Sequence, residues 1–273
     1  MTPPSPDQPL QILLSREELL LVLSLLRTNW IPGIDPDPLG EFNAEQRGLS
    51  LIIAERALRA RQLARLDDSG RVQVHQTLLD SVAVCAFALS SIIIHHFSSS
   101  QAKPARYFGH LRNGICVAHT RPEPDLHLLT QFNEREMLFR EILAICESEN
   151  LPATETPGGR ISTSLLSQVR ALTGDQKAQA AFEKLTASAF PPISARLLVE
   201  ALGGAHQISI VQIVRIAEKD QVENRTFTLL HGERSAWLMV EDPHTTLNGE
   251  ASYLVEAAAP EKIIALFERW ASI

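Results

Sequence analysis

The chain has 273 residues, of which 45% are hydrophobic and 21% charged; this composition is that of a globular protein and excludes a disordered or fibrous one. Its 32 acidic residues outnumber its 25 basic ones, and the net charge of −7 argues against general nucleic-acid binding through phosphate neutralisation. At roughly 150 residues per domain, the length predicts about two domains.

Residues 1–9 contain four prolines, which predicts a flexible tail without the basic and apolar regions of a secretory signal. The apolar part of the longest uncharged stretch, residues 82–97, is too short and too polar to span a bilayer. The three cysteines, Cys85, Cys116 and Cys146, show no C-x-x-C spacing and are typical of reduced core residues. We therefore expect a cytoplasmic protein with no membrane partner.

The first helix is predicted by a capping box, in which Ser15 and Glu18 precede a leucine-rich run. This helix should begin just after Ser15 and be buried. The following residues 30–38 contain three prolines and a glycine and are expected to form a loop. Its two carboxylates, Asp35 and Asp37, could form a metal pair, but acids separated by prolines are more typical of a solvated turn.

A long helix is predicted from about residue 44 to residue 66, before the turn signal at residues 67–70. Wound at 100° per residue, one side collects small and aliphatic side chains and should pack closely against a neighbour; these are Leu49, Ile53, Ala57, Ala60 and Ala64. The arginines of this helix also resemble those of a winged-helix recognition helix. A DNA-binding regulator that uses helix 45–66 is therefore an alternative, although the i, i+4 pair Glu55–Arg59 favours a solvated, salt-bridged surface.

The first sheet is predicted around a hairpin. After a helix at 76–89 and a strand at 90–97, Asn113-Gly114 fits a two-residue type I′ turn between strands. That turn fixes a register and places six side chains on one face, pairing Arg112 with Ile115, His110 with Val117, and Phe108 with His119. A strand at 126–132 and an amphipathic helix opened by Asn133 follow.

A proline- and glycine-containing linker is predicted at residues 151–160, and the same order of elements then recurs. The expected second-half helices are opened by Ser162 and cover 175–187 and 194–202; strands follow at 207–217, 225–231, 235–240 and 252–256, and a last helix starts at Pro260. The pairs Ile92–Ile210 and Gly114–Gly232 are both 118 positions apart. The sequence thus predicts an α+β fold with two pseudo-symmetric lobes, residues 10–150 and 161–273, each with a few helices, an antiparallel β-meander and a closing helix.

Histidine is the residue type that most suggests chemistry. The hairpin register makes His110 and His119 diagonal neighbours on one face, within reach of a shared zinc ion, but two ligands do not complete a site. Cys116 and His119 point to opposite faces and cannot act as nucleophile and base. No H-E-x-x-H, G-x-S-x-G, P-loop or G-x-G-x-x-G motif is present. We therefore expect no enzyme, no cofactor and no small-molecule substrate.

Three stretches together resemble the EspG family of cytosolic chaperones, which recognise substrates of type VII (ESX) secretion systems. They are residues 57–63, residues 67–72, and the apolar helix with Leu78, Leu79 and Cys85. The opening region at 14–21 and the duplicated halves are similar to that family too. The resemblance implies a non-catalytic protein that holds the hydrophobic tip of a helical secretion substrate and keeps it soluble before export.

The resemblance also implies that the partner surface involves the second-half sheet and its adjoining helices. In that sheet we expect Phe227, Trp237 and Met239 to be the best candidates for partner contact, because strand alternation places Trp237 and Met239 on one face. Core packing under the last helix is the other interpretation of these three residues.

Overall fold

The computed structural model describes residues 9–35, 39–40, 42–100, 103–151, 156–217, 221–247 and 249–271, with only the backbone at 243–246. The expected tail at 1–8, Asp37 and residues 152–155 of the expected linker lie outside the described residues. The chain divides into two compact units. Unit 1 holds the residues up to Ile92 together with Arg106–Leu138, and unit 2 holds Ile93–Ala105 together with the residues from Phe139 on.

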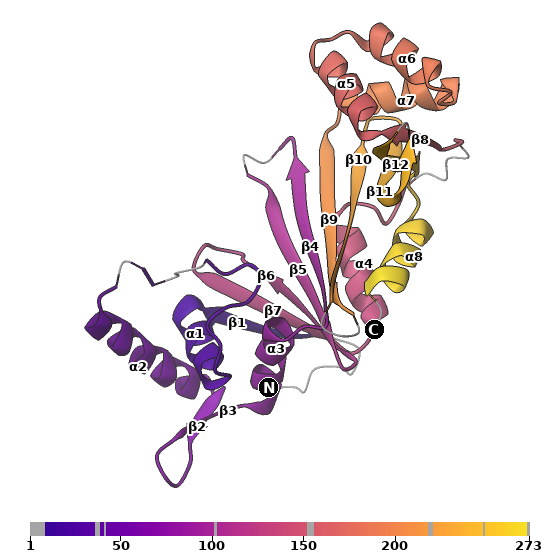
Figure 1. The fold of residues 1–273 in the computed structure, drawn as a ribbon. Coiled ribbons are helices and arrows are strands. Elements are labelled where there is room, and N and C mark those ends of the chain that lie inside the picture. Colours follow the sequence, from indigo (N-terminus) through magenta and orange to yellow (C-terminus); the bar gives the residue numbers. More distant parts are fainter. Residues whose placement is uncertain are drawn as a thin grey trace. The chain divides into compact units, whose positions relative to one another are not determined.

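Unit 1 combines an antiparallel sheet with three helices and a small separate hairpin (Figure 1). Its elements are β1 (Leu10–Ser15), α1 (Arg16–Leu25), α2 (Ala44–Ala60), β2 (Ala64–Leu66), β3 (Val72–Val74), α3 (Gln76–Ala86), β5 (Ala105–Arg112), β6 (Ile115–Thr120) and β7 (Leu126–Phe132). The strand order is β1-β7-β6-β5, and β2 pairs only with β3. Strand β4 (Ser90–Ser98) and helix α4 (Arg135–Ile145) are divided between the units.

The predicted hairpin register is confirmed. Strands β5 and β6 pair Arg112 with Ile115, His110 with Val117 and Phe108 with His119. The two turn residues both have positive φ, 50° at Asn113 and 78° at Gly114. These are the angles that a type I′ turn requires, and asparagine and glycine adopt them most readily.

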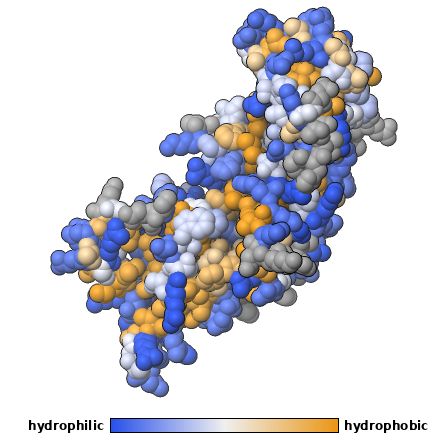
Figure 2. Space-filling model, in the orientation of Figure 1, coloured by the Kyte–Doolittle hydropathy of each residue, from blue (hydrophilic) through white to orange (hydrophobic). Residues whose placement is uncertain are grey.

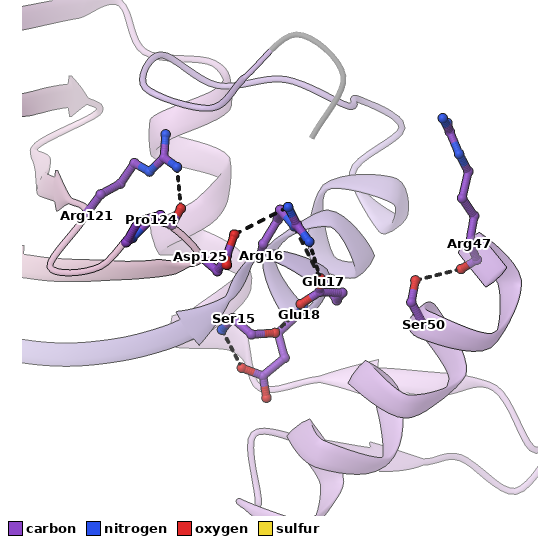
Figure 3. Close-up of polar contacts among 9 residues, drawn as sticks. All are labelled: Ser15, Arg16, Glu17, Glu18, Arg47, Ser50, Arg121, Pro124 and Asp125. Carbon is purple, nitrogen blue, oxygen red and sulfur yellow. Dashed lines mark hydrogen bonds and ion pairs between the residues drawn. The ribbon is translucent and has the colours of Figure 1, made fainter. Parts of the chain in front are cut away.

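The start of α1 is also confirmed, and Figure 3 shows its polar contacts. The Ser15 hydroxyl accepts a hydrogen bond from the Glu18 backbone, and the Glu18 carboxylate accepts one from the Ser15 backbone at 2.9 Å. Arg16, at the first position of α1, forms ion pairs with Glu17 at 3.1 Å and with Asp125 at 3.3 Å. Because Asp125 immediately precedes β7, this contact ties the helix to the sheet.

The core of unit 1 lies between one face of the sheet and the helices. Leu14 of β1, Val117 of β6 and Leu129 of β7 form one buried cluster with apolar side chains of α1 and α3. Leu58 of α2 belongs to the same cluster. We did not predict β1 or the hairpin β2–β3. Strand β1 gains its hydrogen bonds from β7, more than 100 residues later in the sequence, and local sequence does not encode that pairing.

The prediction for α2 is wrong in two respects. The helix ends at Ala60 rather than at residue 66, because Gln62 turns the backbone with a φ of 60° and β2 follows. The side we expected to be packed is also the wrong one. Leu49 and Ile53 are exposed, whereas Ala54 and Leu58 are the buried residues of the helix.

Unit 2 contains a helical bundle, an antiparallel sheet and a closing helix. Its elements are β8 (Gly159–Ser162), α5 (Thr163–Gly174), α6 (Ala178–Ala187), α7 (Pro192–Gly203), β9 (Gln207–Ile216), β10 (Val222–His231), β11 (Ala236–Leu247), β12 (Glu250–Ala257) and α8 (Pro260–Ala271). The strand order is β9-β10-β11-β12-β8, with β4 beside β9. Ser162 caps α5, and Pro260 is the first residue of α8, both as predicted.

Strand β8 was not predicted, and it includes the last two residues of the expected linker. It gives unit 2 the same order of elements as unit 1: an opening strand, a capped helix, two or more further elements, four strands and a closing helix. The α+β fold class is therefore confirmed. A two-fold symmetry between the lobes remains a prediction. Among the described residues, no helix is both long and apolar enough to cross a membrane.

Candidate protein-binding surfaces

A groove of about 870 Å³ lies on unit 1 where α1, the end of α2, the hairpin β2–β3 and the start of α3 meet. Its lining is Leu25, Leu26, Arg59, Gln62, Leu63, Ala64, Arg65, Val72, Gln73, Val74, His75, Gln76 and Leu79. Aliphatic side chains from α1, the hairpin and α3 contribute to it, and α2 contributes Arg59. Figure 2 shows hydrophobic surface over this group of helices. An open apolar groove with a polar margin is typical of a protein-binding surface.

The sequence pattern predicts helix at residues 61–66 and therefore does not predict this groove. The turn at Gln62 instead directs the chain into β2 and opens the space between α2 and the hairpin. A positive φ at a non-glycine residue is not readable from sequence, so no local signal could have placed the groove.

Three of the arginines behind the DNA-binding alternative have partners within unit 1. Arg59 pairs with Glu55 at 3.1 Å, as expected for i, i+4 residues. Arg61 donates to the buried Glu18 carboxylate at 2.8 Å, and Arg65 donates to Gln73 at 3.2 Å. These contacts favour a structural role over a phosphate-binding one, since each guanidinium already has an acceptor.

A second candidate surface is on the helical bundle of unit 2. Ile193, at the start of α7, is 72% exposed, more than any other large hydrophobic residue of the described chain. A smaller groove of about 290 Å³ lies between α6 and α7. There the Arg196 guanidinium lies 5.7 Å from the centre of the Phe182 ring, and Glu200 forms an ion pair with Arg234. This surface combines one exposed apolar side chain, Ile193, with a charged margin.

Phe227, Trp237 and Met239 are all buried in unit 2. The Phe227 ring contacts Phe267 and Trp270 of α8, with centroids 5.7 and 6.2 Å apart. Trp237 and Met239 instead belong to the core beneath the bundle. Their placement is that of core packing, the other interpretation given above, and partner contact through them stays a prediction.

His110 and His119 lie on one face of the first sheet, as predicted, and both are buried. The Phe108 ring stacks on each of them, at 6.5 and 5.6 Å between centroids. His119 makes its contact with His127 of β7, not with His110: the Nε2 atom of His119 is 2.9 Å from Nδ1 of His127. No group of three or more metal-ligating side chains is found in the described ranges.

The His119–His127 pair forms a short hydrogen-bond chain. The other nitrogen of His119, Nδ1, donates to the Pro32 carbonyl at 3.2 Å, so Nε2 must accept from the Nδ1–H of a neutral His127. Burial lowers the pKa of His119 to about 3, and the neighbouring His127 is the second cause of this lowering. Burial also lowers the pKa of His127 to about 4, and the positive charge of Arg121 is the second cause. Both rings are therefore neutral at pH 7.

The loop at residues 30–35 covers this pair through its Pro32 carbonyl, while its Asp35 carboxylate lies in solvent, as expected for a solvated turn. Ile31 and Ile34 are buried, although Asp35 is exposed and pairs with Arg121 at 3.5 Å. Gly33 has a φ of 91°, and a Cβ at this position would lie 2.4 Å from the Phe108 ring. Only glycine satisfies both conditions.

The cysteines offer no reactive thiol. Cys85, Cys116 and Cys146 are free and buried, as expected. Burial raises the pKa of Cys116 to about 11, and the nearby Glu136 raises it further. Burial also raises the pKa of Cys146 to about 11. A thiol that stays protonated at pH 7 is a poor nucleophile.

Comparison with known proteins gives a likeness of fold only. No family model matches the chain, and no curated protein matches its sequence. Among solved structures, the chain is similar to the type VII secretion system chaperone EspG5 of Mycobacterium tuberculosis, solved in complex with the PE25–PPE41 dimer. The TM-score is 0.65 at 10% sequence identity, and the match covers 94% of this chain and 94% of that one. The fold expected from the family resemblance is thus present along nearly the whole chain.

Proposed function

We propose that this protein is a non-enzymatic, cytoplasmic chaperone that binds the hydrophobic tip of a helical protein destined for type VII secretion. The observation that carries this proposal is the fold likeness to EspG5 along 94% of both chains. Low sequence identity leaves the partner open, since a fold can serve several functions. The exposed apolar surfaces of both units and the protonated, buried cysteines add support for binding rather than catalysis.

The bundle of unit 2 is the surface that we assign to the substrate. Ile193 gives the bundle an exposed apolar contact, and the groove beside Phe182 can take one apolar side chain from a helical tip. Arg196 and the ion pair between Glu200 and Arg234 form a charged margin around this contact. The margin would disfavour binding of less polar protein partners. Apolar centres with polar margins are how transient partners usually bind.

The test is co-expression of the full chain with each PE–PPE-type pair encoded by its host. A stoichiometric complex in size-exclusion chromatography with light scattering, and a substrate that is insoluble alone, are expected. Replacing an exposed apolar contact by a charge should weaken binding at least tenfold, so we expect Ile193→Asp to do so in titration calorimetry. Leu25→Asp, in the groove of unit 1, is the matched control and should bind as the unchanged chain does.

Two results would overturn parts of the proposal. If no pair forms a soluble complex, the chaperone function is wrong. If Leu25→Asp abolishes binding while Ile193→Asp does not, the substrate binds at the groove of unit 1 and our placement on the bundle is wrong.

A further inference from the structure

The outward side of α2 is apolar, although none of the described residues of unit 1 covers it. Leu49, Ile52 and Ile53 are 57%, 48% and 57% exposed. The opposite side of the same helix, with Ala54 and Leu58, packs into the core. A surface helix normally has polar residues outside and one apolar stripe inside, so α2 carries a second stripe that folding of unit 1 does not need.

The charges along this stripe have a regular order. Glu45, Leu49, Ile52 and Arg56 are spaced i, i+4, i+7 and i+11, which places them on one line along the helix. We call these four residues the α2 seam. Glu45 lies at its first turn and Arg56 near its last, and both are exposed. Neither side chain forms an ion pair or hydrogen bond with any other residue that the structure describes.

The α2 seam is complementary to itself in the antiparallel direction. A two-fold axis midway between Leu49 and Ile52 would place Glu45 of one helix opposite Arg56 of the other, and Leu49 opposite Ile52. Each pairing would occur twice. In the parallel direction Glu45 would instead face Glu45, and Arg56 would face Arg56, which is repulsive. Isologous contacts of this kind are the commonest way in which identical chains associate.

Gly48 adds a second observation. It lies in the interior of α2, where glycine is destabilising relative to alanine. A Cβ at this position would meet nothing within 4 Å, so no packing inside the chain requires a glycine there. Beside an apolar seam, a residue without a side chain lets the backbone of a second helix approach closely.

We propose that the α2 seam binds a second copy of this chain, with the two α2 helices antiparallel. The contact spans about three helical turns and is small beside the roughly 1,600 Å² of a standard interface, so the dimer should be weak, with a dissociation constant in the micromolar range. Self-association of this kind would reduce the exposed apolar surface of the protein while it is abundant, and dilution would reverse it.

The experiment is sedimentation equilibrium of the full chain from micromolar to millimolar concentration. The unchanged chain should dimerise. Glu45→Arg and Arg56→Glu should each weaken the dimer at least tenfold, because each creates two like-charge contacts. The double variant E45R/R56E restores both attractions and should dimerise again. An equimolar mixture of the two single variants should form a heterodimer, and circular dichroism checks that every variant is folded.

Ile193→Asp, in the other unit, is the matched control and should not change the dimer. The proposal is wrong if the unchanged chain is monomeric up to millimolar concentration, or if neither the double variant nor the mixture recovers association. It is also wrong if the single variants lose substrate binding with no effect on self-association, because the α2 seam would then belong to the secretion substrate. Ile193→Asp tests substrate binding and the seam variants test self-association. The proposed function and this inference can therefore fail independently of each other.

Discussion

Removal of the Arg61 side chain should destabilise unit 1 more than removal of any other arginine of that region. Its guanidinium donates to both oxygens of the Glu18 carboxylate, at 2.8 and 3.1 Å, and also to the Leu13 carbonyl. The Glu18 side chain is only 5% exposed, whereas that of Arg61 is 43% exposed. Without Arg61, the buried carboxylate would keep only the Ser15 backbone N–H as a donor from the described residues.

The magnitude follows from this unequal exposure. Breaking a fully buried ion pair costs about 3–5 kcal/mol, and breaking an exposed one about 0–1 kcal/mol. With one partner buried and the other in contact with water, Arg61→Ala should lower the free energy of unfolding by about 2 kcal/mol. In a chain of this size that corresponds to a fall of roughly 5 °C in Tm.

The assay is urea unfolding followed by circular dichroism, with Arg65→Ala as the control. Arg65 donates to the Gln73 side chain on the exposed hairpin, so its removal should cost less than about 0.5 kcal/mol. Adding Glu18→Gln to Arg61→Ala removes the stranded charge and keeps the capping box, since glutamine can fill that position. The double variant should therefore be more stable than Arg61→Ala alone. An equal or lower stability would show that the buried charge is not what makes the loss large.

Two further predictions concern the covered face of the first sheet. The pKa values of His119 and His127, about 3 and about 4, are below the unfolded value of about 6.5. The stability that the two neutral rings contribute is therefore fully present above pH 6.5 and is lost as the pH falls toward 3. Between pH 7 and pH 5 each histidine should lower the free energy of unfolding by about 2 kcal/mol. His119→Gln should therefore reduce the change in urea midpoint between these two pH values. An unchanged pH dependence in this variant would rule out the pair as its source. Gly33→Ala should lower stability by about 2 kcal/mol or more, because the new Cβ would meet the Phe108 ring in addition to the strain of a φ of 91°. Gly70→Ala, with a φ of 77° and open space, isolates the strain at about 1 kcal/mol, and equal Tm shifts for the two variants would contradict the steric explanation.

Features with a local physical cause could be predicted from the sequence. The Asn113-Gly114 turn set the register of β5 and β6, because few other residue pairs adopt positive φ twice in succession. The capping residues Ser15 and Ser162 marked the starts of α1 and α5, because their hydroxyls satisfy free backbone N–H groups.

Features that depend on distant partners could not be predicted. Strands β1 and β8 are held by β7 and β12, and their own residues do not specify those pairings. The contact between His119 and His127 depends on the register of β6 against β7, which no tight turn fixes. For α2 the helical period was correct but the choice of side was not, because both of its sides carry aliphatic residues.

The shared order of elements in the two units explains why α2 is open. In that order α2 corresponds to α6, and α6 packs against both α5 and α7 in a three-helix bundle. Its buried residues are Ala181 and Leu185, while Glu183 and Lys184 are exposed on its outer side. In unit 1 the hairpin β2–β3 follows α2, and α2 packs mainly on α1. A helix with fewer neighbours needs a more polar outer side to remain stable in water alone, yet α2 has the more apolar one. A stripe that the described part of the chain does not bury is therefore best accounted for by a partner. The order of charges on the α2 seam makes a second copy of the chain the partner that fits.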